Sequence, residues 1–344
     1  MNENGLRCHI TPATSLLLSV CLLLNAAPAQ SATTCTADMT DVQFGSSDPY
    51  AGWTDVNATL SYNCNTLGLS LLAGAAVRLC FSIGSGSQGT GSILPRRMLD
   101  GSNELQFNLF SDAARTQVWG TFPSGHVEVT LEYSVPVLGG SGSGTLQVYG
   151  RVESNQLSAI PGSYSYTNSF SGSDAQMTYR YNEQLLGIGN PSIPTNCTSS
   201  GIGGGSDDFP FTASATVNAA CNPTFSVQNI DFGTQGLLTA AIDTTATLSP
   251  QCTNTTPYQV GLDNGLHASG NTRRMQSSGG QYVTYELYRD AGRSQRWGNT
   301  QNVDTLGGTG AGDAQNVTIY SRVASQNTPP SGDYSDTVTV TIYY

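Results

Sequence analysis

An all-β protein with two tandem sandwich domains is the fold class that the sequence predicts, from three observations. The 344 residues include 39 glycines and only 11% charged residues, and they contain no long apolar stretch of helical period. Apolar and polar residues alternate with a period of two in several short segments. The two halves of the chain also repeat the same residues in the same order, which indicates a duplicated domain.

Residues 1–32 have the pattern of a secretory signal peptide. An apolar core from Leu16 to Leu24 follows Arg7 and leads into small-residue sites that end at Ala29 and Ala32. The core is too short to span a bilayer, and no later stretch is longer. We therefore expect export through the periplasm to the cell surface, with cleavage after Ala29 or Ala32 and no membrane insertion.

The alternating segments define the expected strands in chain order. Their apolar positions in the first half are Val56, Ala58, Leu60 and Tyr62, then Val77, Leu79, Phe81 and Ile83, then Leu105, Phe107 and Leu109, then Val127, Val129, Leu131 and Tyr133. Those in the second half are Val283, Tyr285 and Leu287, then Val338, Val340, Ile342 and Tyr344. Glycine-rich turns separate the strands. We expect a first domain at residues 33–190, a linker at 191–208 and a second domain at 209–344.

The repeat supplies matched landmarks in the two halves. The pairs are Phe44-Gly45 with Phe232-Gly233, Arg96-Arg97-Met98 with Arg273-Arg274-Met275, Trp119-Gly120 with Trp297-Gly298, and Tyr149-Gly150-Arg151-Val152 with Tyr320-Ser321-Arg322-Val323. Identity across two domains reports shared architecture before shared chemistry. We interpret the repeated Trp, Arg and Phe-Gly positions as fold determinants: a core aromatic residue, a buried arginine and a turn.

Six cysteines remain after the signal peptide, and an even number in an exported protein indicates disulfides. Cys35 and Cys64 occupy the positions of Cys221 and Cys252 in the repeat. The simplest scheme pairs Cys35 with Cys64 and Cys221 with Cys252, which leaves Cys80 for Cys197.

Charge and composition exclude several function classes. All 13 basic residues are arginine and the net charge is −11, so a nucleic-acid partner is not expected. No Cys-x-x-Cys occurs, and His126 and His267 are the two histidines outside the signal, so we predict no metal site and no cofactor. No nucleophile elbow, phosphate-binding loop or paired metal ligands support an enzyme.

The repeated landmarks, with the closing run from Pro329 to Ile342, resemble the spore coat protein U domain, the module of archaic, Csu-type chaperone–usher pili. The resemblance covers nearly the whole mature chain in two copies. Residues 209–344 fit it closely. Residues 33–190 keep the landmarks but differ in loop lengths and lack the final Asp-Thr-Val-Thr-Val run.

The resemblance implies immunoglobulin-like sandwiches, of which the C-terminal one lacks a strand and accepts a donor strand from a neighbouring pilin subunit. Main-chain hydrogen bonds and alternate side chains would hold such a strand. Val338, Val340 and Ile342 are the expected acceptor edge. The implied partners are a periplasmic pilus chaperone, an outer-membrane usher and the neighbouring pilin subunit.

A donor strand in this family lies ahead of the first cysteine, and here at most five residues would precede Cys35 after signal cleavage. The resemblance therefore implies a pilus tip subunit, the position of an adhesin. A segment with donor character does occur inside the chain, where Phe211, Ala213, Ala215 and Val217 alternate. It either completes the first domain in cis or forms the first strand of the second, and the sequence leaves both alternatives open.

Insertions in the first half locate candidate adhesive loops. Arg96 lies 32 positions after Cys64, but Arg273 lies only 21 after Cys252. Apolar residues in such loops either pack on the core or form contact surface for an abiotic or host surface. The candidates are Leu69, Leu71, Leu72, Val135, Pro136, Val137, Leu138, Leu186 and Ile188. The alternative functions are a non-fimbrial coat or matrix protein and a carbohydrate-binding module, for which Trp53 could stack on sugar rings.

Overall fold

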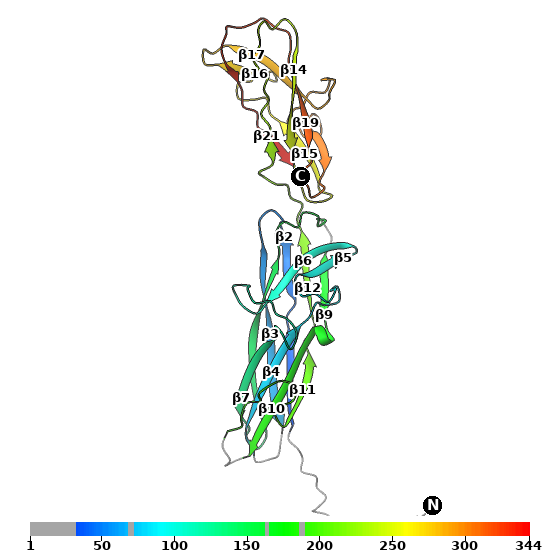
Figure 1. Ribbon diagram of the computed structural model, residues 1–344, viewed down its shortest axis with the longest axis vertical. Coiled ribbons are helices and arrows are strands. Elements are labelled where there is room, and N and C mark those ends of the chain that lie inside the picture. Colours follow the sequence, from blue (N-terminus) through cyan, green and yellow to red (C-terminus); the bar gives the residue numbers. More distant parts are fainter. Residues whose placement is uncertain (1–31, 68–71, 162–164, 186–189) are drawn as a thin grey trace, which may run out of the picture.

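A computed structural model of the chain describes residues 32–344 except 68–71, 162–164 and 186–189. The described chain is almost entirely β-strand, which confirms the predicted fold class. Two elongated domains lie end to end along the long axis of the molecule (Figure 1). The predicted signal peptide falls outside the described residues, apart from Ala32. No helix among the described residues is long and apolar enough to cross a membrane.

The first domain is a sandwich of two sheets. The larger sheet has the order β1-β3-β8-β6-β5-β9-β12-β2. Its strands are β1 (Ala32–Met39), β2 (Val42–Ser47), β3 (Thr54–Leu67), β5 (Arg96–Asp100), β6 (Asn103–Phe110), β8 (Gly140–Val152), β9 (Tyr166–Phe170) and β12 (Phe211–Val217). The smaller sheet, in the order β11-β10-β4-β7, contains β4 (Leu72–Ile83), β7 (Val127–Ser134), β10 (Ala175–Leu185) and β11 (Gly203–Asp208). One short 3-10 helix, η1 (Gly172–Asp174), precedes β10.

The second domain repeats this plan with fewer strands. Its larger sheet has the order β13-β14-β19-β17-β16-β20, with β13 (Ser226–Val227), β14 (Ile242–Ser249), β16 (Arg273–Ser277), β17 (Tyr282–Tyr288), β19 (Val317–Val323) and β20 (Tyr334–Ser335). Its smaller sheet has the order β18-β15-β21, with β15 (Pro257–Leu262), β18 (Leu306–Thr309) and β21 (Val340–Tyr343). Counterparts of three strands, β2, β11 and β12, are absent from the described part of this domain.

A buried arginine and a buried tryptophan anchor each core at matched positions. In the first domain the guanidinium of Arg96 donates to the carbonyls of Ile83, Gly84 and Trp119, and the Trp119 indole donates to the Phe81 carbonyl at 2.9 Å. All of these groups are buried, so each hydrogen bond satisfies an acceptor that water does not reach.

The second domain repeats the anchor with its own residues. Arg273 donates to the carbonyls of Leu262, Asp263 and Trp297, and the Trp297 indole donates to the Val260 carbonyl at 2.8 Å. Burial lowers the pKa of both arginines, that of Arg96 to about 9. The interpretation of the repeated arginine and tryptophan as fold determinants is confirmed.

Three disulfides form with the predicted pairings. Cys35–Cys64 joins directly opposite residues of β1 and β3, and Cys221–Cys252 joins residues that form a matching antiparallel bridge. Cys80–Cys197 ties β4 to the segment that precedes β11. The third disulfide therefore holds the segment before β11 against the smaller sheet of the first domain.

The segment expected to be a linker belongs structurally to the first domain. Arg78 Nε donates to the Pro194 carbonyl at 2.6 Å, and Cys197 is bonded to β4. β11 then pairs antiparallel with β10, although the sequence Gly-Gly-Gly-Ser-Asp-Asp has no strand-like pattern. Pairing with an existing edge strand, rather than intrinsic propensity, sets this strand. The first sandwich extends to Val217, beyond the expected boundary at residue 190, and residues 218–220 connect the domains.

Candidate functional site

β12 completes the first domain from within the chain. It lies between β9, to which it is antiparallel, and β2, to which it is parallel. Phe211, Ala213, Ala215 and Val217 point into the core and are at most 4% exposed. The ring of Phe211 stacks on Phe170 with centroids 4.5 Å apart. Of the two alternatives that the sequence left open, the structure shows the segment completing the first domain.

The second domain has a groove where the first domain holds β12. The segment Ile230–Phe232 corresponds to the start of β2, and β20 with Asp336 corresponds to β9. The groove between them has a volume of about 420 Å³. It is lined by Val227, Gln228, Asn229, Ile230, Phe232, Leu262, Met275, Tyr285, Leu287, Ile319, Tyr334, Ser335, Asp336, Val338 and Val340. Most of these side chains are apolar, so the groove exposes core surface to water.

Two of the three predicted acceptor-edge residues line this groove. Val338 and Val340 are wall residues, and with Ile342 they are half-buried against the core of the second domain. Val340 and Ile342 belong to β21, which pairs antiparallel with β15. Val338 lies at the position of Phe170 in the first domain, where the aromatic ring of Phe211 stacks.

A polar cluster forms one wall of the groove. The Asp336 carboxylate accepts hydrogen bonds from the Tyr285 hydroxyl at 2.8 Å and from the backbone nitrogen of His267 at 3.1 Å, and Nδ1 of His267 lies 3.1 Å away. Burial and the bond to this carboxylate raise the pKa of Tyr285 far above its ordinary value. The first domain has Asn168 and Phe107 at the positions of Asp336 and Tyr285. The groove of the second domain is therefore more polar at this point.

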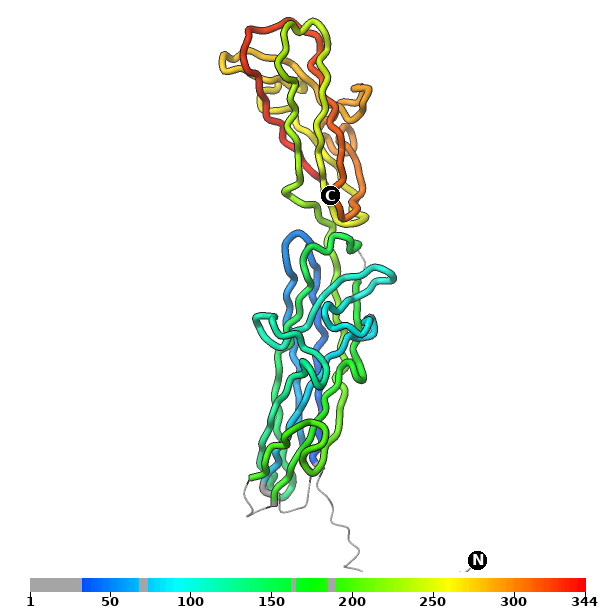
Figure 2. The backbone as a smooth tube through the Cα atoms, in the orientation of Figure 1, coloured from blue at the N-terminus to red at the C-terminus, as the bar shows by residue number. Residues whose placement is uncertain are grey.

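The other candidate site is the end of the first domain that lies away from the second domain. β3 ends here at Leu67, β7 ends at Ser134, β8 begins at Gly140 and β11 begins at Gly203 (Figure 2). Four apolar side chains at this end are exposed: Leu67 (64%), Val137 (57%), Leu138 (84%) and Ile202 (68%). Pro136 is exposed beside them. We call these residues the apolar tip.

A hydrogen-bond cluster beneath the apolar tip joins the two sheets. Thr33 and Thr66 hydroxyls lie 2.7 Å apart, and Thr33 Oγ1 donates to the Glu183 carboxylate at 2.8 Å. Thr66 and the Tyr133 hydroxyl are 2.8 Å apart. The cluster links β1, β3, β7 and β10, so the strand ends that carry the exposed loops are held in place.

The candidate adhesive residues divide into three groups. Val137, Leu138 and Pro136 are exposed at the apolar tip, which is the second of the two alternatives that the sequence left open. Val135 was expected to be a contact residue, but it is only 2% exposed because it packs against Ala75 and Tyr133. Leu69, Leu71, Leu186 and Ile188 lie outside the described residues, as does the side chain of Leu72.

Sequence reasoning missed Ile202 and Leu67. Ile202 fell in the expected linker, and its signal is an isolated isoleucine between Gly201 and Gly203, which leave it no neighbouring side chain to pack on. Its backbone nitrogen donates to the Tyr181 carbonyl at 2.9 Å, which fixes it at the strand end.

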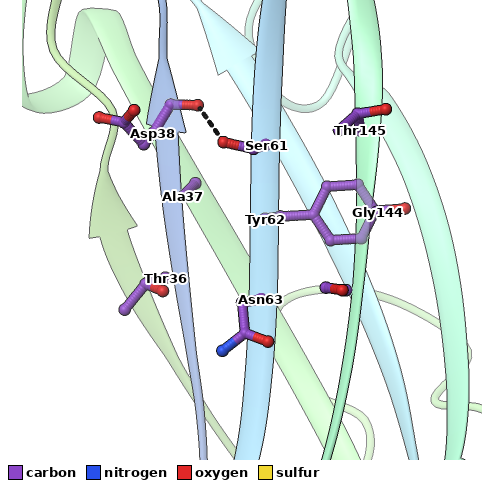
Figure 3. A pocket seen from close by; sticks show the side chains of 9 residues that line it. Thr36, Ala37, Asp38, Ser61, Tyr62, Asn63, Gly144 and Thr145 are labelled. Atoms are coloured by element: carbon purple, nitrogen blue, oxygen red, sulfur yellow. Dashed lines mark hydrogen bonds between the residues drawn. The ribbon is translucent and has the colours of Figure 1, made fainter.

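One further pocket and two side-chain clusters in the described residues give weaker support for a binding site. Figure 3 shows a shallow hollow on the β1-β3-β8 surface, lined by small polar side chains and floored by Tyr62, whose ring points toward Gly144. His126 and Glu128 lie near Cys80, but that sulfur is in a disulfide and offers no thiolate to a metal. Trp53 is 61% exposed and stacks on the guanidinium of Arg151, 3.9 Å from its ring centre.

Comparison with known proteins gives a family match over most of the chain. Residues 21–168 and 207–341 match the Spore Coat Protein U domain. Protein U of Myxococcus xanthus is 34% identical over 152 residues, which are 42% of this chain and 75% of that protein.

Among solved structures, the chaperone–tip adhesion subunit complex CsuC–CsuE of Acinetobacter baumannii aligns with a TM-score of 0.46 and 18% identity, over 90% of this chain and all of that chain. The CupB6 tip adhesin of Pseudomonas aeruginosa aligns with a TM-score of 0.28 and 12% identity, over 91% of this chain and 95% of that chain.

Proposed function

The chain belongs to the spore coat protein U domain family, and we propose that it is the tip adhesin of a chaperone–usher pilus. Its second domain joins it to the neighbouring subunit, and the apolar tip of its first domain attaches the cell to a surface. The observation that carries the proposal is the open groove of the second domain, at the place that β12 fills in the first.

The groove suits an extended strand from another subunit. A donor entering it would pair with Ile230–Phe232 on one side and with the segment around Asp336 on the other, as β12 pairs with β2 and β9. Its alternate side chains would cover Leu262, Leu287 and Ile319. Each large apolar side chain buried this way contributes on the order of 1.5–3 kcal/mol.

Within the described residues, every strand of the first domain is paired in that domain's own sheets, so none of them is free to be given to another subunit. Ala32, Thr33 and Thr34, directly ahead of Cys35, already pair with β3 in the domain's own sheet. β12 is likewise committed to its own domain. A subunit that accepts a strand but does not donate one occupies the pilus end, and the apolar tip lies at the end of the molecule opposite the acceptor domain (Figure 1).

The apolar tip supports attachment to apolar surfaces, abiotic or host. Val137, Leu138 and Ile202 are more than half exposed on loops that the strand ends hold in place. Burying a few such side chains against a surface gives one molecule a weak binding affinity. Many pili that bind the same surface together raise the overall avidity. In this proposal the subunit passes through the periplasm with a pilus chaperone in its groove and leaves through an outer-membrane usher.

The proposal is tested by co-expressing the mature chain with a periplasmic pilus chaperone. We expect a one-to-one complex, from which a synthetic peptide copying a pilin donor strand displaces the chaperone and gives a heat-resistant product. A chain that folds alone and binds neither the chaperone nor the peptide would contradict the proposal and favour a self-complete coat or matrix protein.

Adhesion is tested with the double variant Val137→Ser and Leu138→Ser. We expect bacteria carrying it to attach less to a hydrophobic plastic, with unchanged folding, because both side chains are exposed. The matched control is Val303→Ser, which replaces a valine on the second domain that is more exposed (71%) than Val137 (57%). Attachment that is unchanged in the double variant, or reduced equally in the control, would exclude this loop.

A second candidate function, carbohydrate binding, rests on Trp53. An exposed aromatic ring is suited to stacking on a sugar ring, although Arg151 already occupies part of it. Glycan arrays with the wild-type chain and Trp53→Ala distinguish the two functions. Saturable glycan binding that is lost in this variant would favour a carbohydrate-binding module over apolar adhesion.

A further inference from the structure

We infer that the far end of the second domain, at loops 236–241 and 324–330, is a docking surface for the folded body of the neighbouring subunit, built like the junction between the two domains of this chain. The inference rests on the proposed function, because it assumes that a neighbouring subunit delivers a strand to the groove. It adds a second contact, separate from the strand, with its own residues.

The junction between the domains supplies the template. Two loops of the first domain, at 48–50 and 155–159, face the second domain. The backbone nitrogen of Asn254 donates to the Leu157 carbonyl at 3.1 Å, and its side-chain amide donates to the Ser158 carbonyl at 3.2 Å. The Tyr50 hydroxyl donates to the Gln251 carbonyl at 3.1 Å.

The two backbones approach closely at this junction. A Cβ placed on Gly312 would lie 2.7 Å from the Leu157 carbonyl oxygen, and Gly312 also has a positive φ of 81°. Glycine therefore fits this position on both counts. The second domain therefore contacts the two loops directly, in addition to its covalent connection through residues 218–220.

The second domain rebuilds the two supporting loops at its opposite end. In the first domain the backbone nitrogen of Asn155 donates to the Pro49 carbonyl at 3.3 Å. In the second domain Gln326 donates in the same way to the Leu238 carbonyl at 2.9 Å. Since 155 and 326 are equivalent positions in the repeat, the same pair of loops is joined by the same kind of bond.

The rebuilt surface is uncovered. Leu237 is 75% exposed, and Asn327 and Thr328 are exposed beside it. In the first domain Pro49 is buried and Leu157 is half-buried at the corresponding loops. Leu237 and the loop around Thr328 stand at the positions that the second domain covers at the junction.

The direction of a donor strand in the groove would place the folded part of the donating subunit against this surface. β12 runs parallel to β2 toward the loop at 48–50, and only residues 218–220 separate it from Cys221 of the next domain. A strand that filled the groove of the second domain in the same direction would run toward the loop at 236–241. The attached subunit would then meet Leu237 and the carbonyls near Thr328.

The partner is therefore another spore coat protein U domain. It should present a backbone amide and an amide side chain two positions after its second cysteine, as Asn254 follows Cys252. It should also have glycine at the position of Gly312.

The test uses the full chain with the pilin subunit of the same gene cluster, supplied either as the intact protein or as a peptide of its segment ahead of the first cysteine. A cysteine at Asn327→Cys should cross-link to a cysteine placed two positions after the pilin's second conserved cysteine. Val303→Cys, on the same domain but outside the surface, is the matched control. The variant Leu237→Glu should slow complex formation with the intact pilin about tenfold and leave peptide binding unchanged.

Each outcome decides between the two claims. Cross-linking at position 327 but not at 303, with a selective effect of Leu237→Glu, supports the docking surface. Normal binding of peptide and pilin without cross-linking at 327 overturns it and leaves the proposed function standing. Failure of both peptide and pilin to bind overturns both.

Discussion

The two domains of this chain share their anchors but differ in one groove. In the first domain β12 lies between β9 and β2 and buries Phe211, Ala213, Ala215 and Val217. In the second domain the same space is a groove of about 420 Å³ lined by core side chains. Since the buried arginine and tryptophan are arranged alike in both, the fold does not require the extra strand. In the proposed function, this groove is the part of the fold that accepts a strand from another chain.

The walls of the groove differ between the two domains. Phe170 stacks on Phe211 in the first domain, whereas Val338 stands at its place in the second. Asn168 of the first domain is replaced by Asp336, which Tyr285 and His267 hold by hydrogen bonds. The first groove is built for one resident strand, and the second combines an apolar floor with a polar wall.

The largest effect is expected from a charge placed beneath β12. Ala213 is fully buried, so Ala213→Asp puts an unpaired carboxylate into the core and should destabilise the first domain by about 4 kcal/mol or more. Ser214→Asp, on the opposite face of the same strand, is the control and should cost far less. Calorimetry should show the first domain's transition lost or strongly lowered in Ala213→Asp alone. Equal effects of the two variants would contradict the role of β12 as a core strand.

The second prediction concerns the groove-wall position that holds Phe170 in the first domain and Val338 in the second, where alanine substitution tests whether each groove is filled. Phe170→Ala should cost the first domain about 3–5 kcal/mol, because it removes a ring that is 1% exposed and stacked on Phe211. Val338→Ala should cost the free second domain less than about 1 kcal/mol, since this side chain faces an open groove. Urea unfolding of each variant measures both values. A large cost for Val338→Ala in the free chain would show that the groove is already filled.

The shared anchor should respond alike in the two domains. Arg96→Leu leaves three buried carbonyls without their donor, and Arg273→Leu leaves two buried carbonyls and the half-buried Asp263 carbonyl, at a cost of about 3 kcal/mol in each domain. Calorimetric transitions of the two variants provide the comparison. A cost confined to one domain would show that the two cores are not held in the same way.

The smallest effect is a loss of stability in acid. The side-chain hydrogen bonds from Arg151 and Arg322 are the largest cause that lowers the pKa of Asp55 and Asp243 below 3.8. A carboxylate whose pKa is lower in the folded state stabilises the fold above pH 3.8, and that contribution is lost as the pH falls through the folded-state pKa. Asp55→Asn and Asp243→Asn should each flatten the stability of their own domain below about pH 4. An unchanged pH profile would contradict these two ion pairs.

Much of the architecture could be predicted because it depends on the internal repeat and on the alternation of apolar and polar residues. The repeat located the buried arginines and tryptophans, and it sorted Cys35, Cys64, Cys221 and Cys252 into the pairs that the structure forms. Positions such as Leu60 and Leu79 alternate with polar neighbours and are buried as expected. These features depend on periodicity and spacing, which a sequence shows directly.

The remaining features depend on long-range pairing. The alternation from Phe211 to Val217 suits either domain, and only its register against β2 and β9 assigns it to the first. β11 is rich in glycine and is a strand only because β10 offers an edge. Val135 and Val137 look alike in the sequence, but Ala75 covers the first and leaves the second exposed. None of these outcomes is encoded within a few residues of the site.

The central claim, one filled groove and one open groove in the same chain, is tested most directly by amide hydrogen exchange with and without a donor-strand peptide. In the free chain, amides of Val42–Ser47 and Tyr166–Phe170 should exchange slowly, and those of Ile230–Phe232 and the segment around Asp336 should exchange fast. Adding the peptide should slow exchange in the second set and leave the first set unchanged. Equal protection of both sets in the free chain, with no response to the peptide, would contradict the account.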